Sequence, residues 1–295
     1  MSEFLQFMPS QAPAGEASEP TVQVMVDVEP TPEMPETERE LVKRLRTGRA
    51  ALPVLPQVAE SALRLANDPD ARITDLAGLV DTDPPIAARF MSVANSVAYW
   101  RGLLTSSTQS AIVRLGLANT RDLLFQVVYA ASSGGLKRYQ LQVQRSFKRS
   151  VVAAVAARTA ARELEMETEY DYMSGLLHDI GEARIYRILD GLPKFDDPKL
   201  AKQLVQRYHT AAGAEVAMAW KLPTEIVDSC AAHHDPTAAA VPHVRLVMIA
   251  DAVCDALEAG KSPNLERFEA LGVEVSSARR IIDLTKKAAA TSARA

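Results

Sequence analysis

The sequence predicts an all-α protein, in which an N-terminal helical subdomain packs on a C-terminal helical subdomain. Hydrophobic residues make up 47% of the 295 residues, so most of the chain can form a packed core. Only 5% of the residues are aromatic, and Ala, Leu and Val dominate, a mix that favours helices. Apolar residues recur at helical spacing, and the turns between these segments are too short to leave room for a sheet.

Composition and pattern divide the chain into four parts. Residues 1–40 are rich in Pro and Glu and predict a disordered acidic leader. Residues 41–135 are expected to form the N-terminal helical part, which closes at the break Ser133-Gly-Gly135. Residues 136–260 form the second helical part, and residues 261–295 a C-terminal helical tail.

Helices in the first part are predicted at residues 41–47, 56–67, 75–80, 84–94, 107–115 and 119–131. Thr74 is expected to cap one of them, because its side-chain oxygen can accept from a free backbone N–H group. Asp83-Pro84 is expected to start another, with proline in the first turn. Gly116 is expected to end another. Tyr99 and Trp100 are expected either at the interface between the two parts or at the edge of a core.

The second part also predicts helices, at residues 139–165, 170–189, 209–221, and from Asp197-Pro198, Pro223 and Pro242 onward. The tail predicts a last helix at residues 276–290. Its apolar face, formed by Ala278, Ile281, Ile282 and Leu284, is expected to pack on the body of the protein or on a partner.

The bulk numbers exclude several classes of protein. The net charge is −4 and the pI is about 5.8, so the basic field that nucleic-acid binding needs is absent. No apolar run reaches about 18 residues and no signal-peptide layout is present, so neither a membrane span nor secretion is expected. Cys230 and Cys254 are expected to be buried reduced thiols, which fits a cytoplasmic location.

The most informative stretch is Gly175-Leu-Leu-His-Asp-Ile-Gly181, which places His178-Asp179 in an apolar helix. Burying ionisable groups is costly unless they are paired or bound to a metal. Further candidates follow along the chain: His209, His233, His234 and Asp251. Imidazole and carboxylate are ligands for a divalent ion such as Fe, Mn, Ni, Mg or Zn, so these residues predict a metal centre.

The order His-Asp, His, His-His, Asp on successive helices resembles the site of the HD superfamily of metal-dependent phosphohydrolases. Within that superfamily, residues 41–260 look like an HDOD (HD-related output domain) protein. The first half carries the most specific matches: Leu52-Pro-Val-Leu-Pro-Gln-Val-Ala, Asn67-Asp-Pro-Asp, Asp83-Pro-Pro-Ile-Ala-Ala-Arg-Phe, Val93-Ala-Asn-Ser and Ser110-Ala-Ile-Val-Arg-Leu-Gly. The resemblance implies an all-α fold with an HD-type C-terminal part, and a role in bacterial signal transduction that is often non-catalytic.

The resemblance also assigns the candidate ligands to positions. His178, Asp179 and Asp251 match three metal-ligand positions of the superfamily. His209, His233 and His234 match the positions that hold a second metal in the related HD-GYP phosphodiesterases.

Two residues depart from the pattern of the active enzymes. Arg149 stands where those enzymes have their first histidine, and a guanidinium has no lone pair to give a cation. Glu182 stands where HD-GYP enzymes usually carry a lysine, and a carboxylate repels a phosphodiester. The Gly-Tyr-Pro signature is also missing after His233-His234, where Asp235-Pro236 stands. The sequence therefore indicates a degenerate site.

Metal-free roles stay open for each residue. His178 and Asp179 can form a pair, with Arg149 bridging to Asp179 or Asp251 instead of a metal. His209 can simply open a helix, and His233 can lie at a helix end, where the dipole favours imidazolium. We expect a non-catalytic regulator that binds a signalling protein or a small nucleotide-like ligand. The alternative is a phosphohydrolase or cyclic-dinucleotide phosphodiesterase with one metal, bound by Asp179, His209, His233 and His234.

Overall fold

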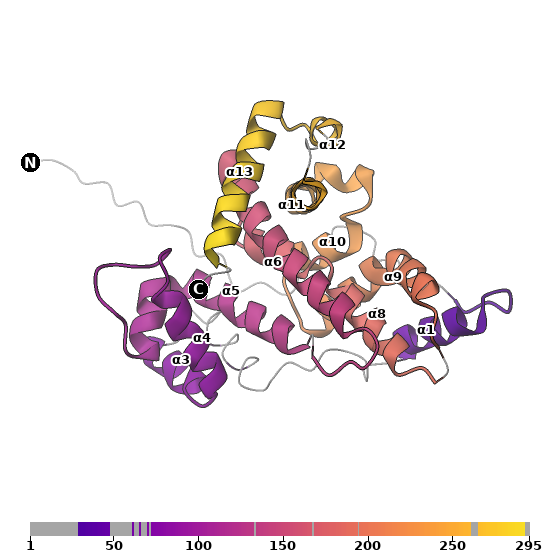
Figure 1. Ribbon diagram of the computed structural model, residues 1–295, viewed down its shortest axis with the longest axis horizontal. Coiled ribbons are helices and arrows are strands. Elements are labelled where there is room, and N and C mark those ends of the chain that lie inside the picture. The colour runs from indigo at the N-terminus through magenta and orange to yellow at the C-terminus, as the bar shows by residue number, and fades with distance from the viewer. Residues whose placement is uncertain are drawn as a thin grey trace, which may run out of the picture.

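The computed structural model describes residues 29–47, 61, 65, 70, 72–132, 134–166, 168–193, 195–260 and 265–292. Within these ranges the regular elements are helices and none is a strand (Figure 1). The all-α prediction is therefore confirmed for this part of the chain. Residues 1–28 of the predicted leader, and most of the predicted helix at residues 56–67, lie outside the described residues.

Three helices of the first half form one end of the molecule: α3 (Ile73–Val80), α4 (Pro84–Ala94) and the start of α5 (Thr108–Ser132). Helix α4 starts at Asp83-Pro84 as predicted, and the Asp83 side chain caps it by accepting from the Ile86 N–H at 3.2 Å. Gly116 was predicted to end a helix, and its φ of 77° does interrupt the helical conformation. A second helical segment follows directly, so Gly116 forms a kink within α5. Thr74 is not a cap, because α3 already begins at Ile73.

The second half is built around α6 (Gln140–Glu163), against which α7 (Asp171–Leu177) and α11 (Pro242–Ala259) pack. It also contains α8 (Ile180–Asp190), α9 (Pro198–Ala219), α10 (Thr224–Ala232) and the short 3₁₀ helix η2 (Pro236–Ala240). The pairs α8–α9 and α9–α10 pack side by side. Small side chains on α6, above all buried alanines from Ala153 to Ala161, allow its neighbours to approach closely.

Two predicted helix boundaries in this half are wrong. The single helix expected at residues 170–189 is interrupted at His178-Asp179, because α7 ends at Leu177 and α8 begins at Ile180. Conversely, no helix begins at His209, which lies inside the continuous helix α9. The apolar spacing of α9 continues across His209, from Leu204 and Val205 to Ala212 and Val216, so nothing stops the helix there.

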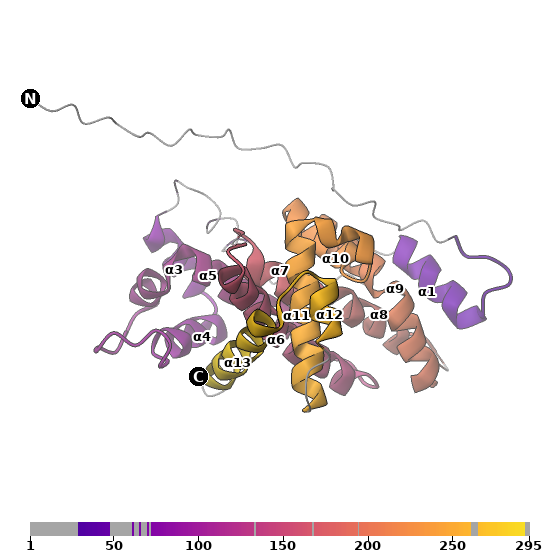
Figure 2. The ribbon, with the colours of Figure 1, turned by 90° about the horizontal axis from the view of Figure 1, so that it is seen from above.

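The first described helix, α1 (Glu36–Thr47), packs on the second half rather than on α3 and α4. Glu38 accepts hydrogen bonds from the Tyr208 hydroxyl (2.6 Å) and from Arg207 (2.5 Å), both on α9. Arg184 on α8 donates to the Leu45 carbonyl at 3.1 Å. Figures 1 and 2 both show α1 beside α8 and α9, at the opposite end of the molecule from α3 and α4. This helix therefore differs from the expected N-terminal grouping and includes the last residues of the predicted leader.

The C-terminal segment folds back onto the body through α12 (Glu266–Ala270) and α13 (Val275–Ser292). Helix α13 lies against α6 and α11 and buries Ala278 and Ile281 as predicted. Leu284, expected on the same face, is 47% exposed, and Thr285 occupies the buried position instead. At 3.6 residues per turn, Thr285 follows the stripe of Ala278 and Ile281 while Leu284 points to one side of it.

Two further expectations concern the whole chain. No helix in the described ranges is long and apolar enough to cross a membrane. Cys230 and Cys254 are both buried free thiols, as predicted.

Candidate functional site

Four ligand-type side chains converge where α8, α9 and α10 meet. Asp179 lies between α7 and α8, His209 in the middle of α9, and His233 and His234 directly after α10. One ligand atom from each side chain lies within 4.8 Å of the others. Asp179 Oδ1 is 3.3 Å from His233 Nε2 and 3.5 Å from His209 Nε2. This cluster, which is named the histidine cluster below, could hold a metal ion.

Backbone carbonyl groups fix how three histidines present their rings. The Nδ1 atoms of His178, His209 and His233 lie 2.8, 3.0 and 2.9 Å from carbonyl oxygens three or four residues earlier in the chain. A carbonyl oxygen only accepts, so each Nδ1 must donate its proton. Each neutral ring therefore carries its lone pair on Nε2. Metal-bound histidines are typically oriented in this way by an outer hydrogen bond.

The Nε2 atoms provide a test of whether these residues fit a cation. His209 Nε2 and His233 Nε2 are only 3.3 Å apart, so two lone pairs face each other unless a proton or a cation lies between them. His178 Nε2 instead lies 3.0 Å from an Asp179 oxygen, and His178 is not one of the four clustered ligands. Ligand atoms about 2.0–2.2 Å from a divalent ion lie roughly 3–4.3 Å from one another. The separations among Asp179, His209 and His233, which are 3.3–3.5 Å, thus fit one divalent ion, and His234 lies within 4.8 Å of them.

Neighbouring charges shift the pKa values of the groups in and beside the histidine cluster. Burial opposes ionisation of Asp179, but His178 and His233 outweigh it and hold the pKa of this carboxyl well below its usual range. Burial likewise disfavours an imidazolium at His178, yet the adjacent Asp179 carboxylate raises its pKa to about 9. Burial lowers the pKa of His209, so that ring is neutral at pH 7, as a metal ligand must be.

Glycines bring the ligand-bearing helices together. A side-chain Cβ at Gly181 would collide with the backbone carbonyl oxygen of His209 and would lie 2.5 Å from the Gly213 nitrogen. At Gly175 it would lie 2.7 Å from the Ala153 carbonyl oxygen on α6. The glycines that flank His178-Asp179 are therefore needed for close helix packing, and Gly181 sets the approach of Asp179 to His209.

Asp251, a further predicted ligand, is not part of this cluster. Its Oδ1 accepts from Arg149 at 2.5 Å, and its Oδ2 accepts from Arg267 at 2.6 Å. Arg149 also pairs with Asp255 (2.8 Å) and Glu258 (2.7 Å). Although burial disfavours its charge, Asp251 has a pKa lowered to about 2, with His178 and Arg149 as the main causes. Of the two carboxylates considered as partners of Arg149, the structure pairs it with Asp251.

Glu182 lies in the first turn of α8, half-buried and close to the histidine cluster. Burial, reinforced by the Asp179 carboxylate, raises the pKa of Glu182 to about 7. The position therefore adds no positive charge to the cluster, and it carries a partial negative charge at neutral pH.

The sequence interpretation missed Arg267 and the full extent of the ion-pair network, which is named the arginine clamp below. Its five members are Arg149, Arg267, Asp251, Asp255 and Glu258. The three acids are spaced i, i+4 and i+7 and so share one face of α11, which is a signal for a cationic partner. Arg267 gives no such signal, because it lies on α12 and reaches the clamp only after the chain has turned back beyond α11.

An all-α fold in which histidines and aspartates converge from successive helices defines an HD-type protein. Residues 52–236, more than half of the chain, match the HDOD domain family, and the chain belongs to this family.

Solved structures agree with the fold. A candidate metal-dependent phosphohydrolase from Shewanella amazonensis SB2B superposes with a TM-score of 0.66 at 22% identity, over 84% of this chain and 99% of that one. An HDOD domain protein of unknown function from Geobacter sulfurreducens gives 0.60 at 23% identity, over 86% and 95% of the two chains. A candidate signal transduction protein from Marinobacter aquaeolei VT8 gives 0.58 at 18% identity, over 86% and 64%. At these identities the likeness concerns the fold.

The curated relatives are longer proteins. An uncharacterized protein of Treponema pallidum is 22% identical over 194 residues, which are 62% of this chain and 38% of that protein. Ribonuclease Y of Thermus thermophilus is 29% identical over 125 residues, which are 42% of this chain and 19% of the enzyme. The matched part thus spans well under half of either relative.

Proposed function

We propose that this protein is a cytoplasmic regulator of bacterial signal transduction that acts by binding, without turnover of a phosphoester. One observation carries the proposal: both carboxylate oxygens of Asp251 are held by arginines, at 2.5 and 2.6 Å. A ligand position of the HD superfamily is thereby engaged in an ion-pair network, and the neighbouring position is a guanidinium that cannot bind a cation.

The chemistry of phosphoester hydrolysis explains why this matters. Two-metal hydrolases use their ions to stabilise both the attacking and the leaving oxygen. The arginine clamp leaves donors for one ion only, the histidine cluster. Glu182, where a lysine would bind phosphate, adds negative charge beside that cluster. Both departures weaken phosphoester turnover, and they act on different parts of the reaction.

A single divalent ion, when bound, would supply a Lewis-acidic charge to the histidine cluster. Asp179, His209, His233 and His234 would hold it, and the choice among Fe, Mn, Ni, Mg and Zn stays open. These four residues come from the α7–α8 junction, α9 and the end of α10, so they would tie three elements together. In the proposed regulator this ion is structural or marks the site of a small ligand.

A surface for a protein partner is supported by exposed apolar side chains in the loop between α4 and α5 and on the first turns of α5. Val97, Leu103 and Leu104 are 85, 75 and 73% exposed, and Trp100 and Val113 are also exposed. Contiguous apolar side chains at a surface mark interaction sites more often than isolated ones do. A photo-crosslinking residue placed at Leu104 should capture a partner in cells, whereas one at Leu141 on α6, which is 66% exposed, should not.

The decisive experiment measures phosphodiesterase activity together with metal content. The purified full chain, reconstituted separately with Mn²⁺, Fe²⁺, Ni²⁺ and Zn²⁺, is assayed with bis-p-nitrophenyl phosphate and with cyclic dinucleotides. We expect up to one bound metal per chain and no turnover above the Asp179→Ala variant. Metal-dependent turnover that is abolished by Asp179→Ala would refute the proposal.

That result would instead support a second candidate, a single-metal phosphohydrolase or cyclic-dinucleotide phosphodiesterase. The observation in its favour is the complete four-ligand histidine cluster with its oriented rings. If this candidate is correct, every active preparation contains bound metal, and activity rises with the metal content. It is rejected if fully loaded protein, with one metal per chain, hydrolyses none of these substrates.

A further inference from the structure

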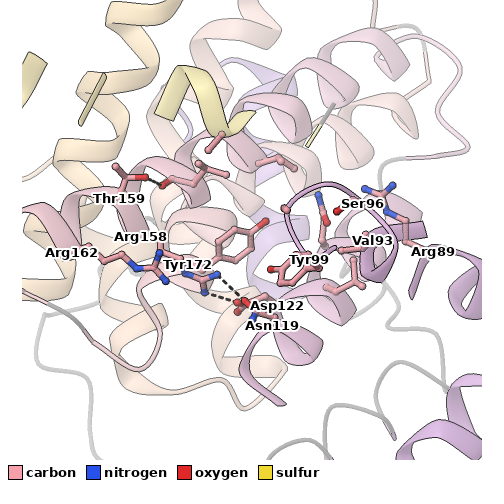
Figure 3. A pocket seen from close by; sticks show the side chains of 16 residues that line it. Arg89, Val93, Ser96, Tyr99, Asn119, Asp122, Arg158, Thr159, Arg162 and Tyr172 are labelled. Atoms are coloured by element: carbon pink, nitrogen blue, oxygen red, sulfur yellow. Dashed lines mark hydrogen bonds and ion pairs between the residues drawn. The ribbon is translucent and has the colours of Figure 1, made fainter. Parts of the chain in front are cut away.

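A second cavity, separate from the histidine cluster, lies between the two halves of the molecule. Its volume is about 450 Å³, within the range of about 300–1,000 Å³ that is usual for small-molecule sites. Its walls come from α4, the loop after α4, α5, α6 and α7, as Figure 3 shows. Tyr99 lines this cavity, in line with one of the two sequence alternatives, while Trp100 is exposed.

Two arginines at one end of the cavity already have partners within the protein. Arg158 pairs with Asp122 at 2.5 Å, a contact drawn in Figure 3, and with Asp171 at 3.4 Å. Arg162 also interacts with another group of the protein. The carboxylate that lines the cavity, Asp122, is thus compensated by Arg158 within the wall. This end of the cavity is therefore closed by internal ion pairs and is not where an anion is expected to bind.

Arg89 on α4 lies at the other end of the cavity. In Figure 3 it lies beside Ser96 and away from Arg158 and Arg162. The Arg89 side chain is half-buried, and within the described ranges it forms no hydrogen bond or ion pair. The planar fork of a guanidinium binds one carboxylate through two parallel hydrogen bonds. A single guanidinium matches the one charge of a carboxylate better than the nearly double charge of a phosphate monoester.

Aromatic rings occupy the part of the cavity between these two ends. Tyr99, from the loop after α4, and Tyr172, from α7, both line it (Figure 3). Burial raises the pKa of both phenols, so each stays protonated at neutral pH and can donate a hydrogen bond. Val93 and Val155 add aliphatic walls. Tyrosine rings pack well on a planar aromatic ligand, whereas an anion without a ring would leave these groups unused.

We propose that this cavity binds a small aromatic monocarboxylate, a molecule in which one carboxylate is joined to an aromatic ring directly or through a short chain. Arg89 binds the carboxylate, and the two tyrosines contact the ring. The ligand touches α4 and α5 of the first half and α6 and α7 of the second, so its binding stabilises this arrangement of the two halves. The site shares no residue with the histidine cluster, and it stands whether or not the function proposed above is correct.

Isothermal titration calorimetry on the full chain at neutral pH tests this site. The probes are 3-phenylpropionate and indole-3-acetate. Acetate and inorganic phosphate are the anions without a ring, and 3-phenylpropanol and indole-3-ethanol are the rings without a charge. We expect at least one of the two aromatic carboxylates to bind about tenfold or more tightly than its alcohol and than either simple anion, because only the carboxylate uses both the guanidinium and the rings.

Variants locate the binding within the cavity. Arg89→Gln should weaken it about tenfold or more, because charge-assisted hydrogen bonds are lost. Arg279→Gln, an equal charge change at an exposed position on α13, should leave the affinity unchanged. Val155→Phe fills the cavity and should abolish binding, and Asp179→Ala in the histidine cluster should have no effect.

Circular dichroism and the melting temperature verify that each variant folds, and Arg89→Gln keeps the test valid if Val155→Phe does not. The proposal is overturned if neither aromatic carboxylate binds at millimolar concentration, or if the matching alcohol, acetate or phosphate binds equally well. It is also overturned if folded Arg89→Gln or folded Val155→Phe keeps the wild-type affinity, or if Asp179→Ala removes the binding.

Discussion

Replacing Arg149 by Met tests whether the arginine clamp is a structural substitute for metal ligation. Methionine keeps much of the aliphatic volume and removes the charge. The substitution breaks the ion pairs with Asp251 (2.5 Å), Asp255 (2.8 Å) and Glu258 (2.7 Å) at once. We expect a measurable loss of stability, because one of these carboxylates is buried.

The magnitude follows from the exposure of each partner. Removing one member of a buried ion pair costs about 3–5 kcal/mol when the other charge is left alone. Asp251 is buried but keeps Arg267 on its second oxygen at 2.6 Å, so about half of that cost, roughly 2 kcal/mol, is expected here. The side chains of Asp255 and Glu258 are 54% and 63% exposed, and their pairs add at most about 1 kcal/mol. The total loss is about 2–3 kcal/mol.

Urea denaturation followed by circular dichroism measures this loss. Arg280→Met on α13 is the matched control, because it breaks a pair with Glu163 in which the arginine is mostly exposed. That variant should lose no more than about 1 kcal/mol. If both variants lose the same free energy within about 0.5 kcal/mol, the clamp has no special role and the reasoning is wrong.

Three further predictions follow from the same geometry. Gly181→Ala should lower the free energy of unfolding by about 3 kcal/mol or more, because the new Cβ would collide with the His209 backbone. Gly78→Ala in α3, where a Cβ meets nothing within 4 Å, should be neutral or up to about 1 kcal/mol stabilising. Equal effects of the two substitutions in urea denaturation would contradict the packing argument. Asp251 has a folded pKa of about 2, below its unfolded value, so the stability that it contributes is present above about pH 4 and is lost between about pH 4 and 2. Asp251→Asn should therefore lose about 2 kcal/mol less stability than the wild type over this pH range. Acid denaturation curves of the two proteins that superimpose would exclude this contribution of Asp251. Saturating Zn²⁺ should raise the melting temperature, by the equivalent of about 2.7 kcal/mol at one hundred times Kd, and EDTA should reverse the rise; a rise that persists in Asp179→Ala would place the ion elsewhere.

The helix starts and the helix stop that the sequence predicted depend on the chemistry of a few neighbouring residues. Asp83-Pro84 and Asp197-Pro198 begin helices because the aspartate accepts a backbone N–H and the proline suits the first turn, and both starts occur as expected. Gly116 takes a positive φ that other residues avoid. These features depend on a few neighbouring residues, so the sequence alone is sufficient.

Tertiary contacts decided the features that were not predicted. The helix is interrupted at His178-Asp179. Just after this break, Gly181 on α8 packs closely against the His209 backbone on α9, 28 residues further along the chain. Helix α1 takes its place through partners on α9 that no local pattern announces. The candidate ligands were named from their order, but the exclusion of Asp251 from the histidine cluster required Arg267, which lies after α11.

The arginine clamp links α6 to α11 through ion pairs. In the two-metal centre of the enzymes that the sequence resembles, metal ligands from both helices would make this link. Here Arg149 on α6 pairs with three carboxylates on α11, so a guanidinium performs that cross-linking. The two arginines and three carboxylates of the clamp leave one net negative charge, which is a modest burden because two of the acids reach solvent. Changing Arg149 alone to histidine would therefore remove the ion pairs between α6 and α11. Arg267 would still pair with Asp251, so this single change would not make Asp251 available to a metal ion.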